Sequence, residues 1–308
     1  MKKRYVTQQF NIGSIGHEKY NFVDVAVNDD NELFIDPYLI ECSNNGWDKE
    51  ASKIMFSFFD CLFSAYRHHD TKLIKLLLSH AGEQNGTRLG YGRGNNGKGN
   101  TAEGLEKIFC PLEELITEIK TISKPADLSV FIPGFAEDGM SDLLTNILHE
   151  QFNNFTMKVL KSYGICSNRA IPFYTWSIEK NEWIKVKRPS IFVDGQELLL
   201  VPKNIVRKNY LFGTGQYFLR IILERMIEDG GYRDSDGKSI AKKDIIKSKR
   251  YSGEHWQYSE VINYSTKHND TLEEYHKKLP GFYLENGLVM SDEELDEVVY
   301  GFVNVQSA

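Results

Sequence analysis

Residues 190–201 read Ser190-Ile191-Phe192-Val193-Asp194-Gly195-Gln196-Glu197-Leu198-Leu199-Leu200-Val201, and they set the class of fold to expect. Two apolar runs flank Asp194-Gly195, and Asp-Gly is a favoured dipeptide for a two-residue hairpin turn. Upstream, residues 173–178 and 183–186 are rich in β-branched and aromatic side chains, which favour strands. These runs predict a small antiparallel sheet beyond the middle of the chain.

Helical spacing of apolar side chains dominates much of the remaining sequence. The expected helices cover residues 54–66, 73–78, 102–120, 141–163, 217–227, 240–250 and 292–302. Short runs that favour strands lie at residues 5–12, 21–27, 33–37 and 129–132, with 21–37 forming a hairpin. We therefore expect an α+β, or mixed α/β, fold with a central small sheet flanked by helices. Residues 1–212 would form a mixed α/β catalytic domain, and residues 213–308 a mainly helical region packed on it.

The composition is that of an ordinary globular protein, with 41% hydrophobic and 26% charged residues among 308. No apolar run is long enough for a transmembrane helix, and no apolar segment of a signal peptide follows the basic start. The four cysteines are widely spaced and form no CxxC motif, which favours free thiols in a reducing compartment. We therefore expect a cytoplasmic protein without membrane partners.

The charge is unevenly distributed, although the formal net charge is −6. Residues 180–250 carry 16 Lys and Arg against 9 Asp and Glu. An acidic chain with a basic stretch can still present a face that attracts phosphate, and the alternative is a solvated surface. The residues of this stretch expected to contact nucleic acid are Arg207, Lys243, Lys247 and Arg250.

Residues 135–146 form the densest polar cluster of the sequence. Ser141 is a good N-cap for the helix expected from residue 141, and an acid at Asp142 suits the positive helix end. Together with Asp138, Asp142 makes a carboxylate pair that can hold Mg²⁺ or Mn²⁺ through oxygen ligands. The alternative is a capped helix start with a solvated outer face. That alternative does not account for Asp138.

A glycine-rich stretch covers residues 82–100 and carries three cations, Arg88, Arg93 and Lys98. Its backbone amides and cations could surround phosphate, as in a loop that grips a nucleic-acid backbone. Residues 92–97 have the GxGxxG spacing, but a helix rather than a strand precedes them, so a dinucleotide site is not indicated. A flexible surface loop is the alternative interpretation.

Glu197 and Lys203 lie at the end of the last expected strand, separated by five residues. A lysine in this position can offer a point charge to a phosphate or an attacking water. Glu197 can add a third carboxylate to the metal site. A hairpin with a solvated end explains both residues equally well.

Four motifs occur together: Leu33-Phe34-Ile35-Asp36-Pro37, the glycine loop with Leu89-Gly90-Tyr91, Asp138-x-x-Ser141-Asp142-x-x-Thr145-Asn146, and Leu200-Val201-Pro202-Lys203. This combination resembles a bacterial family of uncharacterised proteins over the first two-thirds of the chain. More loosely, an Asp followed by a later Glu and Lys resembles the PD-(D/E)xK nucleases of restriction and phage defence. That resemblance implies that Glu83 could be the helix-borne acid that some of those enzymes add.

These observations lead to the expectation of a metal-dependent nuclease in bacterial phage defence or restriction. Asp138, Asp142 and Glu197 would hold Mg²⁺ or Mn²⁺, and Lys203 would steady the attacking water or the scissile phosphate. Asp138 and Asp142 should share one pocket with Glu197 or Lys203. The first alternative is a non-enzymatic subunit of a defence system that binds nucleic acid or a partner protein encoded nearby. The second alternative is a nucleotide sensor that uses the glycine-rich loop.

Overall fold

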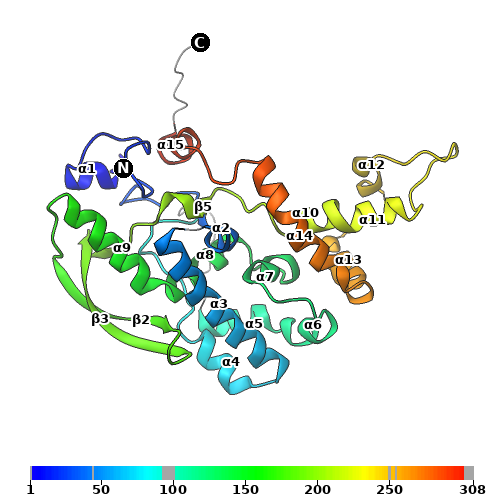
Figure 1. Ribbon diagram of the computed structural model, residues 1–308, viewed down its shortest axis with the longest axis horizontal. Coiled ribbons are helices and arrows are strands. Elements are labelled where there is room, and N and C mark those ends of the chain that lie inside the picture. Colours follow the sequence, from blue (N-terminus) through cyan, green and yellow to red (C-terminus); the bar gives the residue numbers. More distant parts are fainter. Residues whose placement is uncertain (1, 44, 92–100, 249–250, 254, 302–308) are drawn as a thin grey trace, which may run out of the picture.

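The computed structural model describes residues 2–43, 45–91, 101–248, 251–253 and 255–301 (Figure 1). Its larger sheet is antiparallel, in the order β2 (Arg169–Ser177), β3 (Glu182–Val193) and β4 (Gln196–Leu198). Asp194 and Gly195 form the turn between β3 and β4 with φ angles of 52° and 82°, the left-handed values that this hairpin turn requires. The predicted hairpin is therefore confirmed.

A second, two-stranded sheet joins β1 (Phe34–Ile35) to β5 (Val206–Arg207). Asp36 follows β1, and its carboxylate accepts the backbone N–H of Tyr38, so it caps the helix that Pro37 begins. The sequence predicted that residues 21–27 would pair with residues 33–37. That prediction is wrong, because residues 21–27 form backbone hydrogen bonds instead with residues 4–6 and 201–203, and β5 takes the place beside β1.

Helices cover both sheets, and α3 is the central one. In chain order they are α1 (Val6–Phe10), α2 (Pro37–Cys42), α3 (Gly46–Arg67), α4 (Thr71–Leu78), α5 (Ala102–Phe109), α6 (Leu112–Glu118), α7 (Pro125–Phe131), α8 (Glu137–Ile147) and α9 (His149–Ser162).

Phe58 of α3 makes edge-on contacts with Trp176 and Trp183, a cross-strand pair of β2 and β3. Aromatic packing therefore joins α3 to this sheet.

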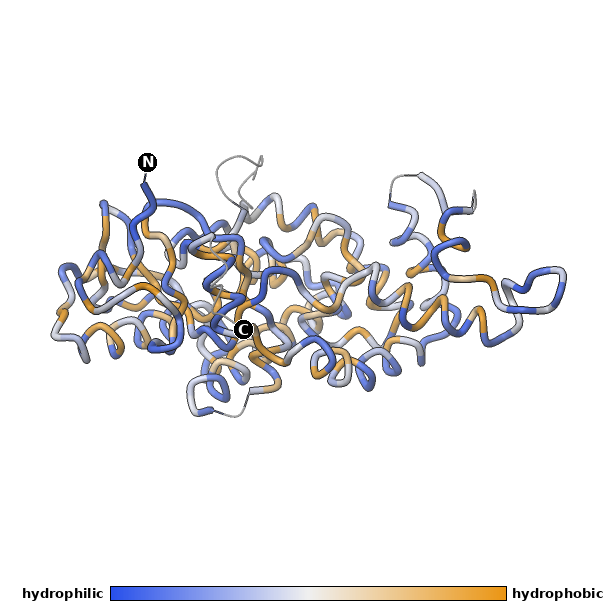
Figure 2. The backbone as a smooth tube through the Cα atoms, turned by 90° about the horizontal axis from the view of Figure 1, so that it is seen from above, coloured by the Kyte–Doolittle hydropathy of each residue, from blue (hydrophilic) through white to orange (hydrophobic). Residues whose placement is uncertain are grey.

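The C-terminal part is helical, as predicted. It comprises α10 (Thr214–Tyr217), a π-helical turn (Phe218–Ile222), α11 (Leu223–Glu228), α12 (Lys242–Ile246), α13 (Trp256–Lys267), α14 (Asp270–Glu285) and α15 (Asp292–Tyr300). Its helices α10 to α14 extend the molecule along its long axis, and α15 returns to lie near the N-terminal segment (Figures 1 and 2). With small antiparallel sheets, a helical majority and a helical C-terminal part, the α+β class is confirmed. Within the described residues, no helix is both long and apolar enough to cross a membrane.

Several local predictions differ from the structure. Residues 6–10 form α1 rather than a strand, because Asp24 binds the backbone N–H and the hydroxyl of Thr7 and fixes a short helix. Residues 129–132 form the end and C-cap of α7, whose start is fixed by Asp127 accepting two backbone N–H groups. The run is apolar and fully buried, and periodicity does not separate helix from strand in such a run.

Buried polar contacts join the C-terminal part to the rest of the molecule. The Tyr283 hydroxyl of α14 donates to Asp36 at 2.6 Å, and His276 Nε2 lies 2.7 Å from Asp127 Oδ1. From α15, the Tyr300 hydroxyl donates to Asp24 at 2.8 Å. Asp36 is fully buried, and this burial raises its pKa to about 6.

Candidate functional site

Asp138 and Asp142 lie one turn apart on the same face of α8. The helix begins at Glu137, four residues earlier than the sequence predicted, and its N-cap is Ala136. Ser141 is therefore not the N-cap. Its hydroxyl instead accepts the backbone N–H of Ile35 in β1 at 3.2 Å. Because Asp142 lies past the first turn, helix capping does not explain it.

The segment that follows α4 passes directly over this carboxylate pair. The Gln84 N–H approaches Asp142 Oδ1 at 3.5 Å, and the backbone N–H of Tyr91 donates to Asp138. Asn146 Nδ2, one turn beyond Asp142, donates to the Gly82 carbonyl at 2.6 Å. The segment and α8 thus enclose the two carboxylates from both sides.

Gly90 is the point of closest approach. Its φ of +132° is rare for residues with a side chain, and a Cβ built there would lie 2.8 Å from Asp138 Oδ1. A glycine is therefore required both by the backbone conformation and by the carboxylate that it touches. The sequence identified Leu89-Gly90-Tyr91 and Asp138 as separate motifs, and the structure joins them.

The pair lies in a strongly negative environment. Burial, reinforced by the charge of Asp138, raises the pKa of Asp142 to about 8, with further contributions from Glu83 and Asp30. The pKa of Asp138 is also raised, mainly by burial. Within the part of the chain that the structure describes, neither carboxylate forms an ion pair with Lys, Arg or His. Asp142 therefore stays largely protonated at neutral pH unless a cation is supplied.

The described residues contain no group of three or more His, Cys, Asp and Glu side chains placed to hold a metal ion. A two-carboxylate site remains chemically sufficient for Mg²⁺, which proteins often hold through one or two carboxylates while substrate phosphate and water complete the shell. The residues that fit such an ion here are Asp138 and Asp142. Glu83 and Glu137 add negative charge nearby without entering a chelating cluster.

Glu197 and Lys203 have other partners. Glu197 Oε2 lies 2.9 Å from His149 Nε2, and the His149 ring is stacked on Phe173. Lys203 Nζ donates to the carbonyl of His17 at 2.9 Å and to Asp292 of α15 at 2.5 Å. The sequence predicted that Asp138 and Asp142 would share one pocket with Glu197 or Lys203. The structure brings Asp138 and Asp142 together and holds Glu197 and Lys203 in separate polar contacts.

The residues predicted to bind nucleic acid fall into three groups. Arg88 and Arg207 are buried, and their guanidinium groups bind backbone carbonyls: Val27 and Asn85 for Arg88, and Asn286, Gly287 and Leu288 for Arg207. Both therefore hold chain segments together instead of facing solvent. Lys243 and Lys247 are exposed on and just after α12. Arg93, Lys98 and Arg250 lie outside the described residues, as do residues 92–100 of the glycine-rich stretch.

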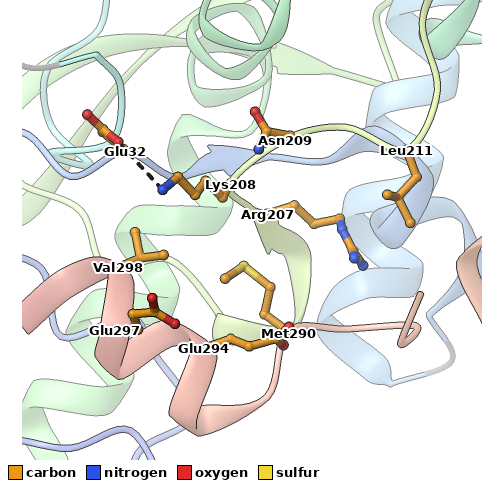
Figure 3. A pocket seen from close by; sticks show the side chains of 9 residues that line it. All are labelled: Glu32, Arg207, Lys208, Asn209, Leu211, Met290, Glu294, Glu297 and Val298. Atoms are coloured by element: carbon orange, nitrogen blue, oxygen red, sulfur yellow. Dashed lines mark ion pairs between the residues drawn. The ribbon is translucent and has the colours of Figure 1, made fainter. Parts of the chain in front are cut away.

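Figure 3 shows a cavity of about 420 Å³ between β5 and α15. It is lined by three glutamates, Glu32, Glu294 and Glu297, together with Arg207, Lys208 and apolar side chains. Lys208 reaches Glu32 at 3.9 Å. Neither Asp138 nor Asp142 lines this cavity, and its mixed charges do not define a phosphate site.

Sequence reasoning missed an exposed aromatic and basic stripe on the β2–β3 ribbon. Tyr174 and Lys185 are cross-strand neighbours, and the Lys185 ammonium lies 5.7 Å from the centre of the Tyr174 ring. The His80 ring stacks on Tyr174 at 3.7 Å, three residues before Glu83. The exposed Lys187 is two residues along the same face. The alternation of exposed positions in β3 was the available signal.

The fold and the site define an α+β protein with a carboxylate pair enclosed between a helix and a glycine-containing segment. The chain belongs to the family described as Domain of unknown function (DUF8370), whose model matches residues 11–212. The matched range includes Asp138, Asp142 and the segment that covers them. Comparison with curated proteins found no match, and comparison with solved structures found none.

Proposed function

We propose that the protein is a metal-dependent nuclease whose Mg²⁺ or Mn²⁺ is held by Asp138 and Asp142. The observation that carries the proposal is this partly buried carboxylate pair, which has no cation partner among the described residues. Burying two like charges together costs free energy, so such a pair is expected mainly where a function requires it. Carboxylates with perturbed pKa values are concentrated at functional sites. A divalent cation would relieve the repulsion and allow both groups to ionise.

The chain contributes a fixed, partly dry frame for this chemistry. The Gln84 and Tyr91 N–H groups orient the carboxylates, and Gly90 lets the backbone approach Asp138. A bound divalent ion polarises a phosphodiester and lowers the pKa of a coordinated water. Glu197 and Lys203 take no part in this version of the site, because His149 and Asp292 already engage them.

The stripe on the β2–β3 ribbon supports a nucleic-acid substrate. Residues 169–193 carry five Lys and Arg against two Glu, in a chain that is acidic overall. Exposed lysines beside stacked rings are typical of surfaces that hold single-stranded nucleic acid. The stripe leads through His80 to the segment over the carboxylate pair. A role in phage defence or restriction is proposed from the resemblance in the sequence alone.

The test is cleavage of plasmid DNA, single-stranded DNA and RNA with Mg²⁺ or Mn²⁺. We expect metal-dependent cleavage that EDTA abolishes and that falls by about 100-fold or more in Asp138→Asn and Asp142→Asn. Asp60→Asn, at an exposed position of α3, is the matched control and should keep full activity.

Equal cleavage by wild type and both variants would identify a contaminating nuclease and overturn the proposal. Nucleic-acid binding without cleavage under any metal would assign the protein to a non-enzymatic binding role.

A further inference from the structure

A second cavity, of about 720 Å³, lies between the start of α3, α9 and the chain around Pro202. Its volume falls within the range of small-molecule sites. None of the residues of the carboxylate pair lines it, so it is separate from the proposed nuclease site. Its walls include Trp47, Asp48, Phe155, Lys158, Tyr163 and Asn204.

Asp48 is the unusual member of this lining. The residue has no exposed surface, yet its Oδ1 atom has no hydrogen-bond partner among the described residues. Oδ2 accepts hydrogen bonds from Ser43, Asn45 and Asn204, so helix capping and local contacts account for one oxygen and leave the other unmet. A buried acceptor without a donor is costly, which indicates that a donor arrives from outside the chain.

The chemistry of the site favours neutral N–H donors over a metal ion. Among the described residues of the lining, Asp48 is the only carboxylate, and it lies in the first turn of α3, where the positive helix end repels cations. Asn204 donates to Asp48 Oδ2 through Nδ2 at 2.8 Å and also lines the cavity, so its amide brings a second acceptor oxygen to the same wall. The cavity therefore offers two hydrogen-bond acceptors on one wall. A single water molecule would satisfy them only in part.

The remaining walls indicate the rest of the ligand. Trp47, Phe155 and Tyr163 supply aromatic surface suited to a flat ring. Lys158 is exposed on α9 and has no ion pair within the described residues, so its ammonium is available for an anion. The ligand would thus carry adjacent donors at one end, a flat body, and a negative group at the other end.

We propose that this cavity binds a guanine nucleotide, with the base directed toward Asp48 and the phosphate toward Lys158. Guanine presents N1–H and N2–H₂ side by side, which matches the two acceptors of Asp48 and Asn204. Uracil presents one N–H between two carbonyl oxygens, and those oxygens would face the carboxylate unfavourably. The proposal does not depend on nuclease activity.

Isothermal titration of the full chain with GMP, UMP and guanosine tests the proposal. We expect GMP to bind about tenfold or more tightly than UMP. Lys158→Ala should weaken GMP about tenfold and leave guanosine unchanged, because only GMP carries the phosphate. Lys161→Ala, an exposed lysine of the same helix outside the lining, is the matched control.

Three outcomes would overturn the proposal: no heat of binding with ~1 mM GMP, equal binding of GMP and UMP, or an unchanged GMP affinity in Lys158→Ala. Asp142→Asn should retain GMP binding. Loss of binding in that variant would place the nucleotide at the carboxylate pair and would also reject the site at Asp48. Asp48→Asn, checked by circular dichroism for a native fold, should lose the preference for GMP over UMP.

Discussion

His17 Nδ1 lies 2.6 Å from Asp296 Oδ1, and the same oxygen accepts the backbone N–H of His17 at 3.0 Å. His17 Nε2 in turn accepts the backbone N–H of Asp24 at 3.1 Å. The imidazole thus connects α15 to the N-terminal segment through both of its nitrogens. Because His17 is completely buried and Asp296 nearly so, this contact holds α15 in place.

Asp296→Ala should lower the free energy of unfolding by about 1–3 kcal/mol, because it leaves the buried Nδ1–H of His17 without its acceptor. Urea denaturation followed by circular dichroism measures this change. Glu293→Ala, at an exposed position of the same helix, should change stability by less than about 0.5 kcal/mol. Equal losses in the two variants would show that the buried pair contributes nothing specific.

The raised pKa of Asp142 predicts a pH-dependent stability. The folded protein keeps this proton up to about pH 8, whereas the unfolded chain loses it near the ordinary value of 3.8. Stability should therefore fall as pH rises between these values, by up to about 1.4 kcal/mol per pH unit. The difference in unfolding free energy between wild type and Asp142→Asn, measured from pH 5 to pH 8, isolates this group. A difference that does not vary with pH would contradict the raised pKa.

A divalent metal ion should compete with the proton of Asp142. Mg²⁺ or Mn²⁺ bound to the ionised pair should raise the melting temperature of the wild type, and more so at pH 8 than at pH 6, because binding displaces the proton. Differential scanning fluorimetry after EDTA treatment measures the shift. Asp142→Asn should show no metal-dependent shift, and a shift of wild-type size in that variant would place the metal elsewhere.

Gly90→Ala should disturb the carboxylate pair. The added Cβ would meet Asp138 Oδ1, and the φ of +132° adds backbone strain, so we expect a loss of about 1–3 kcal/mol in stability and a large loss of activity. Gly134→Ala is the control, since Gly134 has a φ of +79° but nothing within 4 Å of the added atom. If both substitutions affected activity alike, the contact with Asp138 would have no special role.

The two basic surfaces can be separated by charge reversal. Lys185→Glu with Lys187→Glu should weaken binding of a single-stranded oligonucleotide and flatten its salt dependence, because the stripe on the β2–β3 ribbon loses phosphate contacts. Lys243→Glu with Lys247→Glu makes the same charge change at α12. Fluorescence anisotropy at several salt concentrations compares them. A stronger effect at α12 would favour the surface predicted from the sequence over the stripe.

Local chemistry decided which parts of the fold could be predicted. The hairpin at Asp194-Gly195 depends on the turn preference of two residues, and it was correct. Asp138 and Asp142 were predicted as a carboxylate pair at a helix start, with Asp138 ahead of the helix. They share one helix face because α8 begins at Glu137. Both features depend on residues that are close together in the sequence.

Contacts between distant segments could not be read in this way. Arg207 appears in the sequence as a cation in a basic stretch, but three carbonyls at the end of α14 enclose it. Lys203 appears as a strand-end lysine, but Asp292 lies 89 residues later in the chain. Side-chain type indicates that a charge needs a partner, and only the tertiary arrangement decides whether that partner is a ligand or the chain itself.

The contacts made by Asp24, Asp36 and Asp127 connect the residues that the family model matches to the rest of the chain. Each of these acids lies within residues 11–212, and each takes a partner from beyond residue 212: Tyr300, Tyr283 and His276. In a protein shortened at residue 212, these three carboxylates would lose their partners and would have to be hydrated or protonated. The range that a family shares is thus smaller here than the unit that folds, and expression of the matched residues alone should yield aggregated or protease-sensitive material.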